Sequence, residues 1–206
     1  MYPTGDFERL KFEIMERYKD FDIPITFGIL IADYEQSLAR EYILNYIDVF
    51  DKRSNKYIDF FIPGYITHGS NDCIRASMKN KQGEPYYFSR ELFHDFIEKL
   101  ETIFDYQYNF SPVLLLVELK NRDFVGTKKI IIELDTEKTS IKKTGVLFTN
   151  IFKIAKRYAN IKDFSRELTA TYLKDTLADS VVDAIDNSIL TELHTRKKNI
   201  RHFQIK

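Results

Sequence analysis

The chain is poor in cysteine and in the turn residues glycine and proline, and it contains no tryptophan. Of its 206 residues, one is cysteine, seven are glycine and five are proline. The single cysteine, Cys73, excludes an internal disulfide and favours a reducing compartment. It also excludes dithiol exchange, because that chemistry normally needs a second thiol to resolve the mixed disulfide.

Net charge and long apolar runs are also absent. Thirty-one basic residues balance 31 acidic ones, which argues against a protein that coats nucleic acid through a broadly basic surface. The longest apolar runs, such as VLLLV, are far shorter than the roughly 20 residues that span a bilayer. The opening stretch, MYPTGDFERLKFE, has no apolar segment of the signal-peptide kind. These features predict a soluble, cytoplasmic protein with no membrane part.

The sequence lacks the motifs of several common nucleotide, metal and catalytic-cysteine sites. No G-x-G-x-x-G and no GK[ST] motif is present, so no dinucleotide or P-loop phosphate site is expected. The four histidines are scattered, and none has metal-ligand spacing with a cysteine or a second histidine, although two lie near the basic end of the chain. Cys73 has no adjacent histidine to activate it. We therefore expect no metal and no cofactor.

What the chain does contain is an ordered series of strand and helix patterns. Short, mostly apolar runs at residues 25–32, 57–62, 113–119 and 129–134 predict strands, the first covered on both faces. Amphipathic stripes predict helices at residues 6–19 and 89–104, the second capped by Ser89. Another helix is expected to begin at Asp33, which forms a D-x-x-Q capping box with Gln36. Residues 65–84 are polar and predict an irregular excursion.

The C-terminal part reads as helical from residue 136 onward. One apolar stripe includes Val146, Ile151 and Ile154, and a longer one runs from Leu168 through Val182 toward the end. No repeat or low-complexity linker interrupts the chain. We therefore expect a single domain over residues 1–206, with an α/β core at 1–140 and a helical extension at 141–206.

The order β-α-β-α-β-β-α resembles the thioredoxin-like fold. The resemblance implies a mixed central sheet of four or five strands flanked by helices. It also implies a cis-proline at Ser111-Pro112, packed beside the start of the first helix of the motif. The family's CxxC motif is absent, because Asp33-Tyr34-Glu35-Gln36 stands in its place. A binding crevice between these two segments stays open as an interpretation, whereas a redox centre is excluded.

The first candidate site is the edge where the first two parallel strands end, since ligands of open α/β sheets favour that edge. The candidate ligand-binding residues are Asp33, Tyr34, Gly64, Tyr65, His68 and Pro112. The alternative interpretation is purely structural: a helix cap, a turn and a surface histidine.

A second candidate is the tripeptide Glu118-Leu119-Lys120 at the end of an apolar strand. It resembles the core of PD-(D/E)xK nucleases, in which two carboxylates hold a metal and a lysine orients the attacking water. Asp105 is the nearest upstream acid, although it lies at a helix end. A solvated strand terminus is the simpler explanation of the tripeptide, because alternating charges are common where a strand ends.

The C-terminal run is the third candidate. It is strongly basic because it contains Arg196, Lys197, Lys198 and Arg201. Such a segment could bind nucleic acid or an acidic protein surface. The alternative interpretation is a solvated tail without a binding role.

Three functions compete. The first is a non-catalytic interaction module whose partner is another protein of the same system or a second copy, because the catalytic motif is missing and tyrosine is common at interfaces. The second is a nucleotide- or small-molecule-binding enzyme or sensor at the Asp33/Tyr65 edge. The third is the metal-dependent nuclease. Residues 56–65, KYIDFFIPGY, are similar to stretches in uncharacterised bacterial proteins beside multi-gene defence systems, which favours a bacterial accessory protein.

Overall fold

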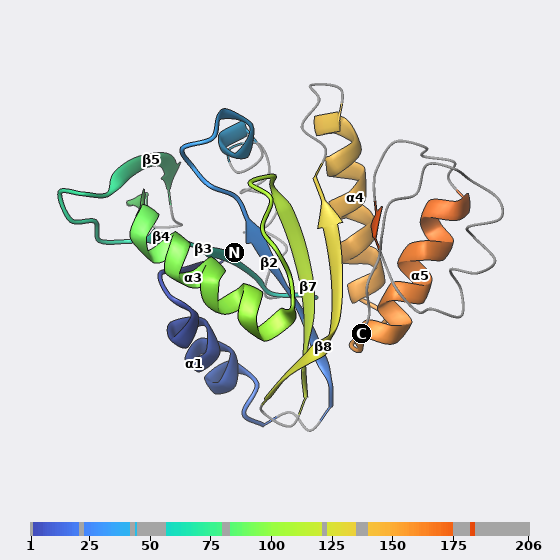
Figure 1. Cartoon of the computed structure of the whole chain (residues 1–206). Helices are drawn as coiled ribbons and strands as arrows, with labels where there is room; N and C mark the ends of the chain where they lie inside the picture. Colours follow the sequence, from blue (N-terminus) through green and yellow to red (C-terminus); the bar gives the residue numbers. More distant parts are fainter. Residues whose placement is uncertain are drawn as a thin grey trace.

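The structure is a computed structural model that describes residues 2–20, 23–41, 44, 57–79, 83–120, 123–134, 140–174 and 182–183. Its centre is a mixed sheet with helices on both faces (Figure 1). The strands are β1 (Tyr2–Thr4), β2 (Ile25–Ile31), β3 (Phe60–Pro63), β7 (Val113–Lys120), β8 (Asp123–Glu133) and β9 (Val182–Asp183), in the order β1-β3-β2-β7-β8-β9. The predicted α/β fold with a mixed central sheet is therefore confirmed.

The sheet has more strands than the sequence predicted because two very short ones join its edges. β1 pairs in parallel with β3, and β9 pairs antiparallel with β8. In the centre, β2 is parallel to β3 and antiparallel to β7, and β7 and β8 form an antiparallel pair. β1 and β9 have three and two residues, too few for a period-2 pattern to identify.

One face of the sheet is covered by α1 (Phe7–Arg17) and α3 (Arg90–Phe104), which lie together in Figure 1. Asp6 caps α1 and Ser89 caps α3, each through its side-chain oxygen, as Ser89 was predicted to do. Phe124 of β8 joins the layers, because its ring contacts Phe7 at 5.5 Å and Phe104 at 5.9 Å.

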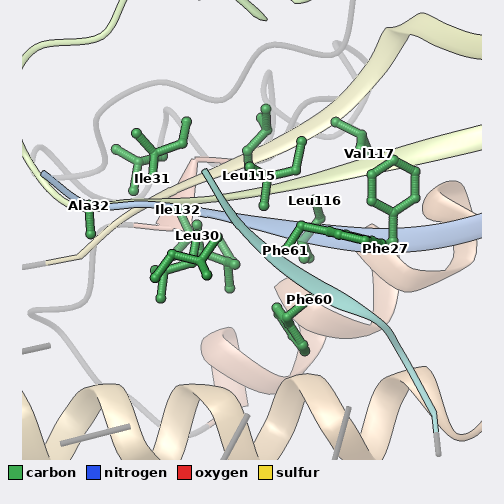
Figure 2. Packing of buried hydrophobic residues seen from close by; sticks show 14 of the residues in the cluster. Phe27, Leu30, Ile31, Ala32, Phe60, Phe61, Leu115, Leu116, Val117 and Ile132 are labelled. Carbon is green, nitrogen blue, oxygen red and sulfur yellow. The ribbon is translucent and has the colours of Figure 1, made fainter. Parts of the chain in front are cut away.

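The opposite face is covered by α4 (Ser140–Ala155) and α5 (Ile161–Lys174), which form the predicted helical extension. Phe60 points toward the helix on this face, whereas Phe27 and Val117 point to the other side of the sheet (Figure 2). The ring of Phe60 contacts Phe148 at 6.2 Å and Phe152 at 5.6 Å, both on α4. Alternation along the strands thus assigns each side chain to one of two buried layers.

The polar excursion forms a second, three-stranded sheet. Its strands are β4 (Tyr65–Ile66), β5 (Ile74–Lys79) and β6 (Pro85–Phe88), in the antiparallel order β4-β6-β5. β4 follows β3 after the single residue Gly64, and Ser89 after β6 caps α3. The small sheet is therefore attached between the end of β3 and the start of α3, on the left of Figure 1.

The helix expected to begin at Asp33 begins at Ser37 instead, and residues 37–41 are helical. Asp33 caps a tight turn: its Oδ1 accepts from the Glu35 amide at 2.9 Å, and its carbonyl accepts from the Gln36 amide at 3.1 Å. The capping-box prediction was wrong because aspartate favours such turns for the same reason that it caps helices.

A second correction concerns the C-terminal stripe. Val182 was expected to continue a helix, but it lies in β9 opposite Ile132 of β8, as suits a β-branched residue. The basic run from Arg196 to Arg201 lies outside the described residues. Within the described part of the chain, no helix has both the length and the apolar character needed to cross a membrane.

Candidate functional site

The turn after β2 and the segment before β7 meet at one edge of the sheet. Ile31 at the end of β2 stands opposite Val113 at the start of β7. Asp33 is two residues beyond Ile31, and Pro112 is one residue before Val113, so the Asp33 turn comes close to the segment that ends at Pro112. Pro112 is buried and its carbonyl accepts from the Leu134 amide at 2.9 Å. No described peptide bond is cis, so the cis-proline that the thioredoxin-like resemblance implied does not occur here.

Tyr34 and Tyr65 form the floor of this edge. Their rings meet edge to face at 6.1 Å, and Tyr65 also packs on Phe88 at 5.2 Å. Tyr65 is fully buried, and its hydroxyl donates to the carbonyl of Ala32 at 3.5 Å. Burial, and then the nearby Tyr34 and Asp33, raise the pKa of Tyr65 well above its usual value. Tyr65 therefore supports the turn from beneath and does not face solvent.

Gly64 allows the small sheet to pack closely against α3. Its φ of +78° is in the left-handed region, and a Cβ there would lie 2.7 Å from the Cβ of Phe93. The Gly64 amide donates to the carbonyl of Thr4 at 2.9 Å, and the Gly64 carbonyl accepts from the amide of Ser89 at 2.8 Å. Of the predicted ligand residues, His68 is the outlier, because it lies on an exposed loop after β4.

The turn itself is held by charged side chains. Glu35 forms an ion pair with Arg90 at the start of α3. Arg40 donates through Nη1 to the carbonyls of Tyr34 and Glu35, at 3.2 and 3.0 Å. The backbone of the turn is thereby fixed relative to α3, and the edge has a defined shape.

The sequence interpretation missed the most distinctive residue at this edge, Phe110. It is 64% exposed and has a φ of +65°, a conformation that is unusual for a bulky side chain. Its ring packs at 5.5 Å on Tyr108, whose ring in turn packs at 5.8 Å on Phe93 of α3. Burial and the charge of Asp33 raise the pKa of Tyr108 to about 12, although the backbone amide of Asp33 opposes the shift.

The loop that carries Phe110 is held in place by side chains. The amide of Tyr108 donates to Glu101 Oε1 at 2.6 Å, and the amide of Ser111 donates to Asn109 Oδ1 at 3.0 Å. Asn109 Nδ2 also reaches Glu133 Oε1 at 3.4 Å. A possible sequence signal was the alternation of aromatic residues in Tyr106-Gln107-Tyr108-Asn109-Phe110, directly before Ser111-Pro112.

The three residues of the nuclease hypothesis have different environments. Glu118 is buried, and its Oε2 accepts from the amide of Ile161, the first residue of α5, at 2.9 Å. A carboxylate is favoured at a helix N-terminus. Lys120 is exposed at the end of β7. Asp105 ends α3 in a left-handed conformation, and its carbonyl accepts from Lys129 Nζ at 2.8 Å.

The sheet separates the two carboxylates. Val117 stands opposite Lys129, whose ammonium group bonds the carbonyls at the end of α3, so this position faces α3. The next residue, Glu118, faces the other side, where α5 begins. The structure therefore does not bring Asp105 and Glu118 together. Among the residues that it describes, no group of three histidine, cysteine or acidic side chains could hold a metal ion.

Comparison with protein-family models, with curated proteins and with solved structures finds no match to this chain. The site is therefore interpreted from its own geometry.

Proposed function

We propose that this protein is an interaction module that binds a partner protein through the edge formed by the Asp33 turn and the loop carrying Phe110. The observation that carries the proposal is Phe110 itself, a large aromatic side chain that is 64% exposed on a loop anchored to α3 and β8. Aromatic residues are common anchors at protein interfaces. A firmly held anchor also binds with a smaller entropic cost.

The backbone of Phe110 strengthens this interpretation. The left-handed conformation costs a residue with a Cβ about 1–2 kcal/mol, and Phe110 adopts it with a φ of +65°. Core packing offsets little of this cost, since the residue is 64% exposed and its ring packs mainly on Tyr108. Strained residues that persist in a fold tend to occur at functional positions.

A protein partner suits this geometry better than a small molecule. Small-molecule sites are concave and enclose their ligand. At this edge Tyr65 is fully buried and cannot line such a cavity, whereas the side chain of Phe110 is exposed to solvent. Phe110 can instead enter a cavity on another surface, with Tyr108 supporting its ring.

In our proposal the scaffold is thioredoxin-like, without its redox chemistry. Support comes from the parallel pair of β2 and β3, the antiparallel pair of β7 and β8, and the position of Pro112 beside the Asp33 turn. We further propose that the protein is an accessory component of a bacterial, cytoplasmic multi-protein system. The support for this part is the short run KYIDFFIPGY.

Affinity purification from the native host tests the proposed function, using wild type, Phe110→Ala and Phe12→Ala. Phe12 is a matched control, because it is 66% exposed but lies on α1. We expect wild type and Phe12→Ala to retrieve the same partner and Phe110→Ala to lose it, with unchanged thermal stability. Equal retrieval by all three proteins would contradict the proposal.

A further inference from the structure

Two carboxylates flank the start of β7, directly after the segment that carries Tyr108 and Phe110. Glu133, exposed at the end of β8, accepts from the side chain of Asn109, the residue before Phe110. Asp33, two residues after the end of β2, is on the other side, because Ile31 of β2 and Glu133 of β8 both pair with Val113 at the start of β7; its charge also acts on the phenol of Tyr108. The segment that carries Phe110 thus enters β7 between two negative charges, one just after β2 and one at the end of β8.

Ion pairing distinguishes these two carboxylates from Glu35 at the same edge of the described structure. Neither Asp33 nor Glu133 forms an ion pair with a described lysine or arginine, whereas Glu35 in the same turn is paired with Arg90. Both make hydrogen bonds to backbone or amide groups instead. Their charge therefore remains to act on an approaching molecule.

We propose that the partner presents an apolar pocket bordered by lysine or arginine side chains, and this inference rests on the proposed function. Phe110 enters the pocket while Asp33 and Glu133 face the cations on its rim. Such complementarity raises the association rate and rejects acidic surfaces, because charges of the same sign would meet.

The test uses the partner protein that wild type retrieves and Phe110→Ala does not. Its affinity for the full chain is measured at about 0.1 M and about 1 M NaCl, between which the Debye length falls from about 10 to about 3 Å. The variants are Glu133→Gln and Asp33→Asn, which keep the hydrogen-bonding oxygen and remove the charge. Glu98→Gln is the control, because Glu98 is exposed in the middle of α3.

We expect each of the two site variants to weaken binding by about two- to fivefold at low salt, and the difference to vanish at high salt. Glu98→Gln should bind like wild type at both. If Glu133→Gln and Asp33→Asn both bind like wild type, or if salt leaves the wild-type affinity unchanged, the inference is overturned while the proposed function stands. If no partner depends on Phe110, or if the only partner is a second copy of this chain, the inference fails as well.

Discussion

The two ends of the β2–β7 strand pair differ in whether their side chains are buried and bonded or exposed to solvent. At one end, Thr26 and Glu118 are buried and bind the connection between α4 and α5: Thr26 donates to the carbonyl of Ala159 through its amide at 2.9 Å and its hydroxyl at 2.8 Å. Glu118 accepts from Ile161 at 2.9 Å. At the other end, Phe110 stands 64% exposed in a strained conformation.

The comparison shows that an acidic residue at a strand end says little about function until its neighbours are known. Glu118 looked like a catalytic acid in the sequence, yet in the structure its carboxylate caps a helix. Asp33 looked like a helix cap, yet it caps a tight turn and its charge acts on the half-buried phenol of Tyr108. The end at Thr26 and Glu118, here called the closed end, stabilises the fold, whereas the end at Phe110, the open end, leaves an aromatic side chain exposed.

The largest effect should come from Gly64, which supports the open end. Gly64→Ala adds a Cβ 2.7 Å from the Cβ of Phe93 in a left-handed conformation. We expect the unfolding free energy to fall by about 1–2 kcal/mol because of the backbone conformation and by about 1–3 kcal/mol more because of overpacking. Urea unfolding measures the loss.

Gly83→Ala is the matched control for Gly64→Ala. Gly83 has a φ of +83°, but nothing lies within 4 Å of its would-be Cβ. It should lose only the backbone contribution of about 1–2 kcal/mol. Equal losses in the two variants would mean that the contact with Phe93 is unimportant.

At the closed end, Glu118→Ala should destabilise the fold by about 1.5–3 kcal/mol, because it removes a hydrogen bond to a charged group and leaves the buried amide of Ile161 without that acceptor. Lys120→Ala, on the same strand but exposed, should change stability by less than about 0.5 kcal/mol. Equal changes in unfolding free energy for the two variants would show that Glu118 is not a structural cap.

The sequence predicted the parts of the fold that rest on local pattern. The amphipathic stripe after Ser89 predicted α3, and the apolar runs predicted β2, β7 and the end of β8. It could not predict the contact between Glu118 and Ile161, because 43 positions of chain separate the two residues. Nor could it predict the exposure of Phe110, since the pattern of a loop does not tell which aromatic side chains it buries.

A smaller effect, with the opposite sign, is expected at Phe110. Asparagine tolerates the left-handed conformation, so Phe110→Asn should raise the unfolding free energy by about 0.5–1 kcal/mol while weakening partner binding. A gain in stability with a loss of function is typical of strained binding sites. Thermal denaturation provides the measurement, and a clear loss of stability would mean that Phe110 serves the core.

The last effect concerns stability at alkaline pH. Tyr108 has a pKa of about 12 in the folded chain and about 10 when unfolded, so it contributes stability fully below pH 10. That contribution is lost as the pH rises from about 10 toward 12. The unfolding free energy of wild type, measured relative to that of Tyr108→Phe, should therefore fall between pH 8 and pH 11. A constant difference in unfolding free energy would place the phenol in an ordinary, solvated environment.

The most direct measurement compares the two exposed phenylalanines inside the host cell. A photo-crosslinking benzoylphenylalanine replaces Phe110 in one variant and Phe12 in another, which are 64% and 66% exposed respectively. Illumination should attach position 110 to one protein of defined mass and leave position 12 without that product. Equal crosslinking from both positions, or the defined product from position 12 alone, would contradict the assignment of the Phe110 edge as the binding surface.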